Sequence, residues 1–246
     1  MTMQTWGLTD PGNIRQQNQD AYSIMSFGRD RALLIVCDGM GGAKSGNVAS
    51  SLAVDVFTEE VRRSQKKVMT KEQAESMMLN ALALANKAVF EQSALSEEFH
   101  GMGTTLVAAY VMKDLAVIIN VGDSRAYHVP FGEGISLVTR DHSIVEYMVQ
   151  RGELTYEQAK NHPVKNVITR AVGTEDTVEG DLYACTVKKD DCLLLCTDGL
   201  SNEMADQEIL FEVAHGVRKS DCCERLLSIA KNRGAPDNVT VAMAVI

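Results

Sequence analysis

Five aspartates stand beside apolar runs, at points where strands are expected to begin or end. Asp38 and Asp198 each follow such a run and precede a Gly; the others are Asp20, Asp123 and Asp237. A single aspartate at a strand end is usually a turn residue, but several at the ends of core strands can converge at one end of a packed pair of sheets. Carboxylates brought together raise one another's pKa unless a cation lies between them. The sequence therefore predicts a site for Mg²⁺ or Mn²⁺, which prefer oxygen ligands.

The segment before Asp20 contains a candidate phosphate ligand. Arg15 lies there, and a guanidinium group can hold a phosphate through two parallel hydrogen bonds. Metal ions that activate water, together with an arginine that binds an oxyanion, indicate hydrolysis of a phosphate ester. The alternative is that Arg15 is an ordinary surface residue, and the sequence alone leaves this open.

Other phosphate and hydrolase chemistries fit the sequence less well. A P-loop needs Gly directly before Lys44, where this chain has Ala43, and Asp38 stands at the earlier glycine position. Haloacid-dehalogenase-type phosphatases need Asp-x-Asp, but Met40 occupies the second position. The five His residues are scattered, which disfavours zinc. No Gly-x-Ser-x-Gly nucleophile elbow is present.

The charge and the cysteines limit the partners and the compartment. The 246 residues include 33 Asp plus Glu against 24 Lys plus Arg, a net charge of −9. A nucleic acid or an anionic membrane would require a basic face, so neither is expected as a partner. The apolar runs are too short to span a bilayer, no signal peptide is recognised, and the six cysteines form no Cys-x-x-Cys pair. We therefore expect a cytoplasmic protein.

Periodicity and turn residues predict one α+β domain over residues 1–246. Strands are expected at 4–9, 21–27, 32–37, 104–112, 115–121, 125–129, 135–139, 181–187, 192–196 and 238–245, and helices near 48–57, 70–89, 206–214 and 221–231. Thr70 and Gln73 form a capping box at the start of the second helix. Helix pairs separated by runs of strands predict a four-layer α-β-β-α sandwich, with two antiparallel sheets face to face and the helices outside.

Residues 141–176 differ from the rest of the chain. They are polar and mix loops with short helical pieces, one of which begins with the capping box of Thr155 and Gln158. A segment of this length within a run of strands is expected to form a surface flap.

Eight short segments, distributed nearly end to end, form a family pattern. They are Thr9-Asp-Pro-Gly-Asn-Ile-Arg15 with Asn18-Gln-Asp20, Asp38-Gly-Met-Gly-Gly42, Gly101-Met-Gly-Thr-Thr105, Val121-Gly-Asp-Ser-Arg125, Thr139-Arg-Asp-His-Ser143, Ile168-Thr-Arg-Ala-Val-Gly173, Thr197-Asp-Gly-Leu200 and Pro236-Asp-Asn238. In this order the chain resembles the PPM-type (metal-dependent, type 2C) protein serine/threonine phosphatases in their compact bacterial form. The resemblance implies the same four-layer sandwich. It also implies hydrolysis of phosphoserine and phosphothreonine in proteins by a metal-bridging hydroxide, without a phosphoenzyme.

The resemblance further implies roles for individual residues at a centre of two Mg²⁺ or Mn²⁺ ions. Asp38 would bridge both ions, and the carbonyl of Gly39 would bind the second. Asp198 and Asp237 would hold the first ion, while Asp20 would orient metal-bound water.

Further expectations concern the edge of this centre and the partners. Asp123 with Asp198 would match a third, weaker metal site. Arg15 would bind the substrate phosphate. Residues 141–176 would be a mobile flap that tunes the access of substrates to the site. The implied partners are phosphorylated proteins and a cognate bacterial serine/threonine kinase whose action the chain opposes. We expect a monomer.

The sequence departs from the family pattern in the loop after Asp38. Many relatives have His and Glu where this chain has Ala43 and Asn47, and some eukaryotic relatives place a His at the position of Met40. That loop therefore lacks an obvious general acid, a group that typically contributes about 10²–10⁴-fold to rate. The departures support one alternative, a catalytically impaired phosphatase-like binding module.

Overall fold

The computed structural model describes residues 3–41, 45–216 and 218–246. The strands are β1 (Gln4–Asp10), β2 (Asp20–Ser26), β3 (Arg31–Met40), β4 (Gly103–Thr104), β5 (Leu106–Met112), β6 (Leu115–Val121), β7 (Arg125–Val129), β8 (Ser136–Leu137), β9 (Asp181–Thr186), β10 (Cys192–Cys196) and β11 (Val239–Val245). The helices are α1 (Gly46–Ser64), α2 (Lys71–Ser93), α3 (Ile144–Gln150), α4 (Tyr156–Lys160), α5 (Asp198–Ser201), α6 (Asp206–His215) and α7 (Cys222–Asn232). Short 3₁₀ turns occur at Glu97–Phe99 and Lys219–Asp221.

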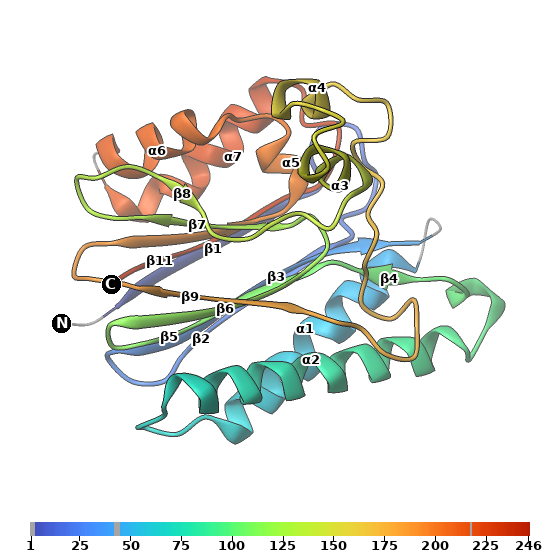
Figure 1. Cartoon of the computed structure of the whole chain (residues 1–246), viewed down its shortest axis with the longest axis horizontal. Coiled ribbons are helices and arrows are strands. Elements are labelled where there is room, and N and C mark those ends of the chain that lie inside the picture. Colours follow the sequence, from blue (N-terminus) through green and yellow to red (C-terminus); the bar gives the residue numbers. More distant parts are fainter. Residues whose placement is uncertain (1–2, 42–44, 217) are drawn as a thin grey trace.

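The strands form two antiparallel sheets that pack face to face between two helix pairs (Figure 1). One sheet has the order β1-β11-β10-β7-β8, and the other has the order β2-β3-β5-β6-β9 with β4 beside β3. Helices α1 and α2 cover the second sheet, and α6 and α7 cover the first. Three layers of buried side chains fill the spaces between these four layers. The predicted α-β-β-α sandwich is confirmed.

The apolar pattern of each element accounts for its place in these layers. Strands β5 and β6 are buried on both faces, because helices cover one side of their sheet and the other sheet covers the opposite side. Helix α2 buries one stripe that includes Ala74, Met78 and Leu82. Its first turn is closed by the predicted capping box, in which the Thr70 hydroxyl accepts from the backbone N–H of Gln73.

The boundaries differ from the sequence prediction at several places near the site. Strand β3 continues to Met40, so Asp38 lies within a strand rather than just beyond one. The expected strand 104–112 is two pieces, β4 and β5, and the strand expected at 135–139 is only the two-residue β8. Helix α5, which begins at Asp198, was not predicted, because one turn directly after a strand is too short for a periodic signal.

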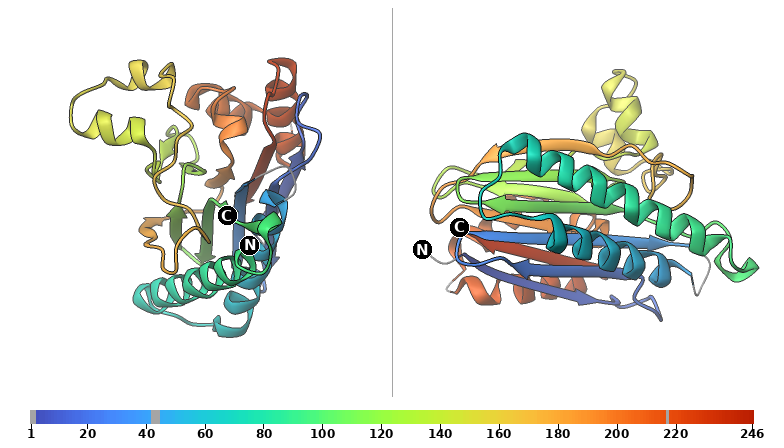
Figure 2. Two further views of the ribbon diagram at one scale, coloured as in Figure 1. Left: turned by 90° about the vertical axis from the view of Figure 1, so that its right-hand side faces the viewer. Right: turned by 90° about the horizontal axis from the view of Figure 1, so that it is seen from below.

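Residues 141–176 extend from one end of the sandwich and carry α3 and α4, as Figure 2 shows from the side. The predicted capping box of Thr155 and Gln158 forms at the start of α4, and the Ser143 hydroxyl caps the start of α3, which the sequence had not indicated. Within the described parts of the chain, no helix is both long and apolar enough to cross a membrane.

Candidate functional site

The five predicted aspartates converge at one end of the two sheets. Asp20 is the first residue of β2 and lies directly opposite Asp38 of β3 in the strand register. Asp198 begins α5, with one residue between it and the end of β10, Asp237 precedes β11, and Asp123 lies between β6 and β7. The pKa of Asp38 is raised well above its usual range by burial, and further by each of the other four carboxylates. The structure therefore brings all five together in one electrostatic cluster.

Burial and mutual repulsion also raise the pKa of three other members. Burial is the larger cause in each case, and it raises the pKa of Asp20 to about 7, that of Asp123 to about 8 and that of Asp198 to about 6. The Asp198 carboxylate adds to the shift at both Asp20 and Asp123, and Asp237 adds to the shift at Asp198. Positive charge placed among these groups would relieve the repulsion and favour their ionised forms.

Two threonine hydroxyls fix the orientation of Asp20. The hydroxyls of Thr240 and Thr197 both donate to Oδ2 of Asp20, at 2.6 and 2.9 Å. The other oxygen, Oδ1, is buried and has no hydrogen-bond partner among the described residues. Neither threonine stands out in the sequence as a site residue, although Thr197 begins the segment Thr197-Asp-Gly-Leu200. Their function depends on contacts across 177 and 220 residues.

A second pair of threonines holds the backbone of Asp38. The hydroxyl of Thr104 donates to the Asp38 carbonyl at 2.8 Å, and the Asp38 N–H donates to the hydroxyl of Thr105 at 2.8 Å. Thr105 also shares a 2.7 Å hydrogen bond with Ser124, which is adjacent to Asp123. These contacts connect the two strand ends that carry Asp38 and Asp123.

The glycines that follow Asp38 and Asp198 are required by close backbone approaches. A Cβ atom on Gly39 would lie 2.0 Å from the carbonyl oxygen of Gly46, and one on Gly199 would lie 2.0 Å from that of Asn238. Contacts this short do not occur, so a larger residue at either position would displace the neighbouring backbone. In each Asp-Gly pair the glycine thus allows the backbone beside the carboxylate to pack directly against another segment of the chain.

Arg15 reaches the cluster from the loop between β1 and β2. Its Nη2 donates to Oδ2 of Asp237 at 2.8 Å, and both side chains are partly exposed, at 53% and 32%. The Asn238 side chain fastens this loop, because it donates to the carbonyls of Pro11 and Gln17 and accepts from the N–H of Gln19. Arg15 therefore lies at the solvent-facing edge of the carboxylates, and Asn238 is a supporting residue that sequence analysis had not assigned.

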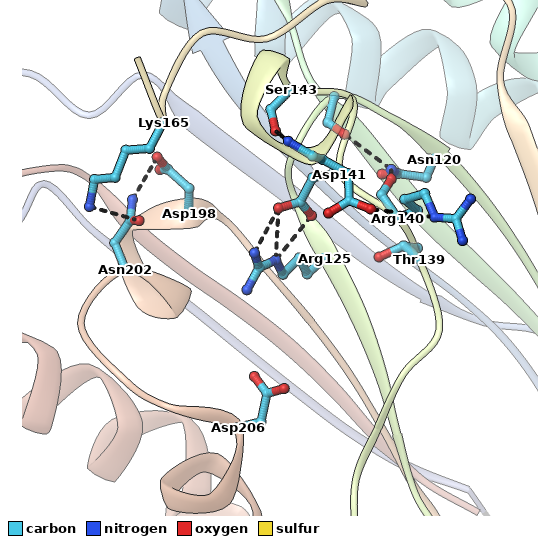
Figure 3. A network of polar contacts seen from close by, with 12 residues as sticks. Asn120, Arg125, Thr139, Arg140, Asp141, Ser143, Lys165, Asp198, Asn202 and Asp206 are labelled. Atoms are coloured by element: carbon cyan, nitrogen blue, oxygen red, sulfur yellow. Dashed lines mark hydrogen bonds and ion pairs between the residues drawn. The ribbon is translucent and has the colours of Figure 1, made fainter. Parts of the chain in front are cut away.

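On the opposite side, residues 141–176 are linked to Asp198 through the side chain of Asn202 (Figure 3). Asn202 donates to Oδ2 of Asp198 at 2.9 Å, and Lys165 donates to the Asn202 side-chain oxygen at 3.4 Å. At the base of the segment, His142 exchanges hydrogen bonds with Gly122, next to Asp123. A cavity of about 1370 Å³ lies between this segment and α5–α6, and Asp123 and Asp198 line it.

The chemistry of this donor set fits hard divalent cations. Among residues 3–41, 45–216 and 218–246, no three His, Cys, Asp or Glu side chains are already gathered as they would be around a single ion. Buried Oδ1 atoms of Asp20 and Asp198 nevertheless have no hydrogen-bond partner in the described chain, and all five clustered side chains offer oxygen. Buried carboxylate oxygens without partners are costly unless a cation compensates them. The residues therefore fit Mg²⁺ or Mn²⁺.

Two of the three departures noted in the sequence lie within the described residues. Met40 is 37% exposed at the end of β3, and Asn47 is exposed in the first turn of α1. Ala43 lies outside the described residues.

Comparisons with known proteins give a consistent result. The family model described as protein phosphatase 2C matches residues 14–234. A serine/threonine phosphatase, stp, from Listeria monocytogenes is 36% identical over 236 residues, which are 96% of this chain and 92% of that relative.

Solved structures of phosphatases share the fold. The crystal structure of the serine/threonine phosphatase Stp1 from Staphylococcus aureus is 36% identical and superposes with a TM-score of 0.92, covering 100% of this chain and 96% of that one. The catalytic domain of the serine/threonine protein phosphatase PstP, solved with two manganese ions, is 30% identical with a TM-score of 0.85 and covers 99% and 97% of the two chains.

Proposed function

Because the chain belongs to the protein phosphatase 2C family and is a metal-dependent serine/threonine protein phosphatase, we propose that the carboxylate cluster around Asp38 is its active site. The observation that carries this proposal is the convergence of five aspartates, two of which keep a buried oxygen without a partner in the described chain. The comparisons give no support to an impaired binding module.

The metal ligands that we propose are side chains of the cluster together with one backbone oxygen. Asp38 and the Gly39 carbonyl would lie at a pair of Mg²⁺ or Mn²⁺ ions, with Asp198, Asp237 and Asp20 completing the set. Manganese ions in the related PstP structure support this choice of metal. When bound, such a pair supplies a hydroxide nucleophile at neutral pH and neutralises charge on the phosphate.

Asp123 marks a further proposed site, shared with Asp198. The Asp123 carboxylate raises the charge density on the flap side of the cluster, and its own pKa is raised by burial and by Asp198. A third, weaker ion at this position would relieve the repulsion between the two carboxylates.

Within this mechanism the chain's own residues hold the substrate and the ligands. Arg15 would bind the phosphate oxygens with its guanidinium fork, since it already contacts a carboxylate oxygen of the cluster. The hydroxyls of Thr197 and Thr240 would keep Oδ2 of Asp20 occupied, which directs Oδ1 toward the cluster.

We also propose the cellular setting. The whole chain would act as one catalytic domain, with residues 141–176 as the flap beside the site that tunes access to it. It would work as a monomer in the cytoplasm, on proteins phosphorylated by a cognate serine/threonine kinase. Phosphatases similar to this chain support the substrate class.

A phosphatase assay tests the active site directly. The purified protein is given a phosphothreonine peptide with Mn²⁺, and phosphate release is measured with and without EDTA. We expect release that requires metal and falls more than about 100-fold in Asp38→Asn, with folding confirmed by circular dichroism. Activity of Asp38→Asn within a few-fold of wild type would contradict the proposed site, and metal-independent release would indicate a contaminant.

A further inference from the structure

The cavity between the flap and α5–α6 continues outward from the proposed active site. It has a volume of about 1370 Å³, with Asp123 and Asp198 at one part of its lining and Asp206 at another. The buried Oδ1 of Asp198 has no hydrogen-bond partner among the described residues. A phosphorylated side chain held at the aspartates would therefore place its neighbouring residues within this cavity.

One cation on the cavity wall is shared between two carboxylates. The Arg125 guanidinium holds Asp141 through three contacts of 2.7 to 3.2 Å (Figure 3). Its remaining Nη1 contacts the hydroxyl of Tyr127 at 3.4 Å, and that hydroxyl donates to Oδ1 of Asp206 at 3.1 Å. Asp141 thus forms a direct ion pair with Arg125, whereas Asp206 is linked to Arg125 only through the uncharged hydroxyl of Tyr127. The group carries one positive and two negative charges.

The other described cations that line the cavity do not compensate Asp206. Arg140 pairs with Glu146 at 3.6 Å, and Lys160 pairs with Glu157 at 3.2 Å, both on the flap side. Lys165 turns toward Asn202, next to Asp198. None of the ion pairs found among the described residues includes Asp206, whose side chain is exposed at the start of α6.

Glu203 adds negative charge to the same wall. Arg233 gives both terminal nitrogens to the Glu208 carboxylate, and its hydrogen bond to Glu203 goes to the backbone carbonyl of Glu203. The α5–α6 wall is therefore acidic, whereas Lys165 of the opposite wall is engaged with Asn202, beside the proposed metal ligand Asp198.

Because the α5–α6 wall of the cavity is acidic, we infer that it selects substrates with a lysine or arginine close to the phosphorylated residue. Asp206 is the specificity-determining side chain. The inference rests on the proposed function and adds the substrate class. Arg125, Asp141 and Asp206 together carry one positive and two negative charges. A basic side chain of the substrate would supply the second positive charge, while the phosphate occupies the aspartate cluster. An acidic side chain at the same place would be repelled.

Peptide kinetics test this inference. Three phosphothreonine peptides that differ only at the flanking positions (Lys, Gln or Glu) are compared by kcat/KM at saturating Mn²⁺. For wild type we expect the Lys peptide to exceed the Gln peptide about two- to fivefold, the range expected for a partly exposed ion pair, and the Glu peptide to be poorest. The preference should shrink as salt rises from 0.05 to 0.5 M.

Variants of Asp206 locate the effect. Asp206→Asn should reduce the Lys-over-Gln ratio to about one, and Asp206→Glu should retain the preference. Asp55→Asn is the matched control, since Asp55 is an exposed acid on α1, in the helix layer on the far side of the sandwich. It removes the same charge and should keep the ratio.

The outcomes separate this inference from the proposed function. Hydrolysis of all three peptides at equal efficiency, or a preference that survives in Asp206→Asn, would overturn the inference alone. Failure of wild type to hydrolyse any of the peptides, the neutral one included, would overturn the proposed function and this inference with it. If Asp206→Asn loses secondary structure, Asp206→Ser removes the same charge at the first residue of α6 and should likewise bring the Lys-over-Gln ratio to about one; a preference that survives in it would overturn the inference.

Discussion

Asp20 and Asp38 lie directly opposite each other on neighbouring antiparallel strands, β2 and β3. Like charges in this position destabilise a sheet, because the side chains point to the same face at short distance. Burial makes the pair more costly, and it raises the pKa of both groups. A folded chain retains such a pair only where something else compensates it, and the cluster with Asp198 and Asp237 offers the oxygen ligands for cations.

The metal-free protein should lose stability as pH rises. The pKa values of Asp198, Asp20 and Asp123 are raised to about 6, 7 and 8, whereas unfolded aspartate titrates near 3.9. Between about pH 4 and 8 the folded chain therefore binds more protons than the unfolded chain, so the free energy of unfolding falls with rising pH. Each pKa unit corresponds to about 1.4 kcal/mol, so we expect a loss of several kcal/mol, measured by urea denaturation in EDTA at pH 5 and pH 8.

Manganese should reverse this trend, because ions compete with protons for the same oxygens and bind more tightly as pH rises. The increase in melting temperature on adding Mn²⁺ should be larger at pH 8 than at pH 5. If the protein in EDTA were more stable at pH 8 than at pH 5, the pKa values of these carboxylates would not be raised in the folded state, and the proposed repulsion among them would be wrong.

Replacing Thr240 with Val should weaken metal binding without altering any proposed ligand. The Thr240 hydroxyl donates to Oδ2 of Asp20 at 2.6 Å, and its loss leaves this oxygen held by Thr197 alone, so the carboxylate is less firmly oriented. Groups that orient metal ligands typically contribute 10- to 100-fold to affinity, so we expect a rise of about that size in the Mn²⁺ dissociation constant measured by calorimetry.

Thr58→Val is the control for this change, since the buried Thr58 hydroxyl has no hydrogen-bond partner among the described residues. It should leave Mn²⁺ affinity unchanged. Equal losses in both variants would attribute the effect to general destabilisation instead.

Replacing Arg15 with Ala should raise KM several-fold at saturating Mn²⁺ and change kcat little, because the guanidinium would hold the phosphate of the bound substrate. Arg15→Lys should recover only part of the loss, since an ammonium cannot make the paired contact. The partly exposed ion pair with Asp237 predicts a stability change below about 1 kcal/mol.

Arg29→Ala provides the comparison, because Arg29 is exposed in the turn between β2 and β3. It removes the same charge at a distance from the cluster. An unchanged KM in Arg15→Ala would mean that the phosphate is bound by other groups.

The Arg125–Asp141 pair should be thermodynamically coupled. Their side chains are 28% and 15% exposed, so either replacement leaves a poorly solvated charge. We expect Arg125→Met and Asp141→Asn each to destabilise the protein by about 1–3 kcal/mol in urea denaturation. The double variant should lose clearly less than the sum, and strict additivity would argue against a direct interaction.

Features that depend on neighbouring residues could be predicted from the sequence. The capping boxes at Thr70 and Thr155 formed as expected, and the apolar runs at 32–37 and 115–121 became buried strands. Alternation, helical period and capping act over a few residues, so they are encoded locally. Helix pairs between runs of strands were then sufficient for the four-layer fold.

The arrangement within the site was decided by tertiary structure. The sequence marked the five aspartates as candidates, but Asp20 meets Thr197 and Thr240 only because strands from opposite ends of the chain pack together. Helix α5, which orients Asp198, is too short to leave a period in the sequence. The acidic wall at Asp206 likewise depends on Tyr127, 79 residues away. Sequence patterns determine which residues lie at strand ends, whereas long-range sheet pairing determines which of those ends meet.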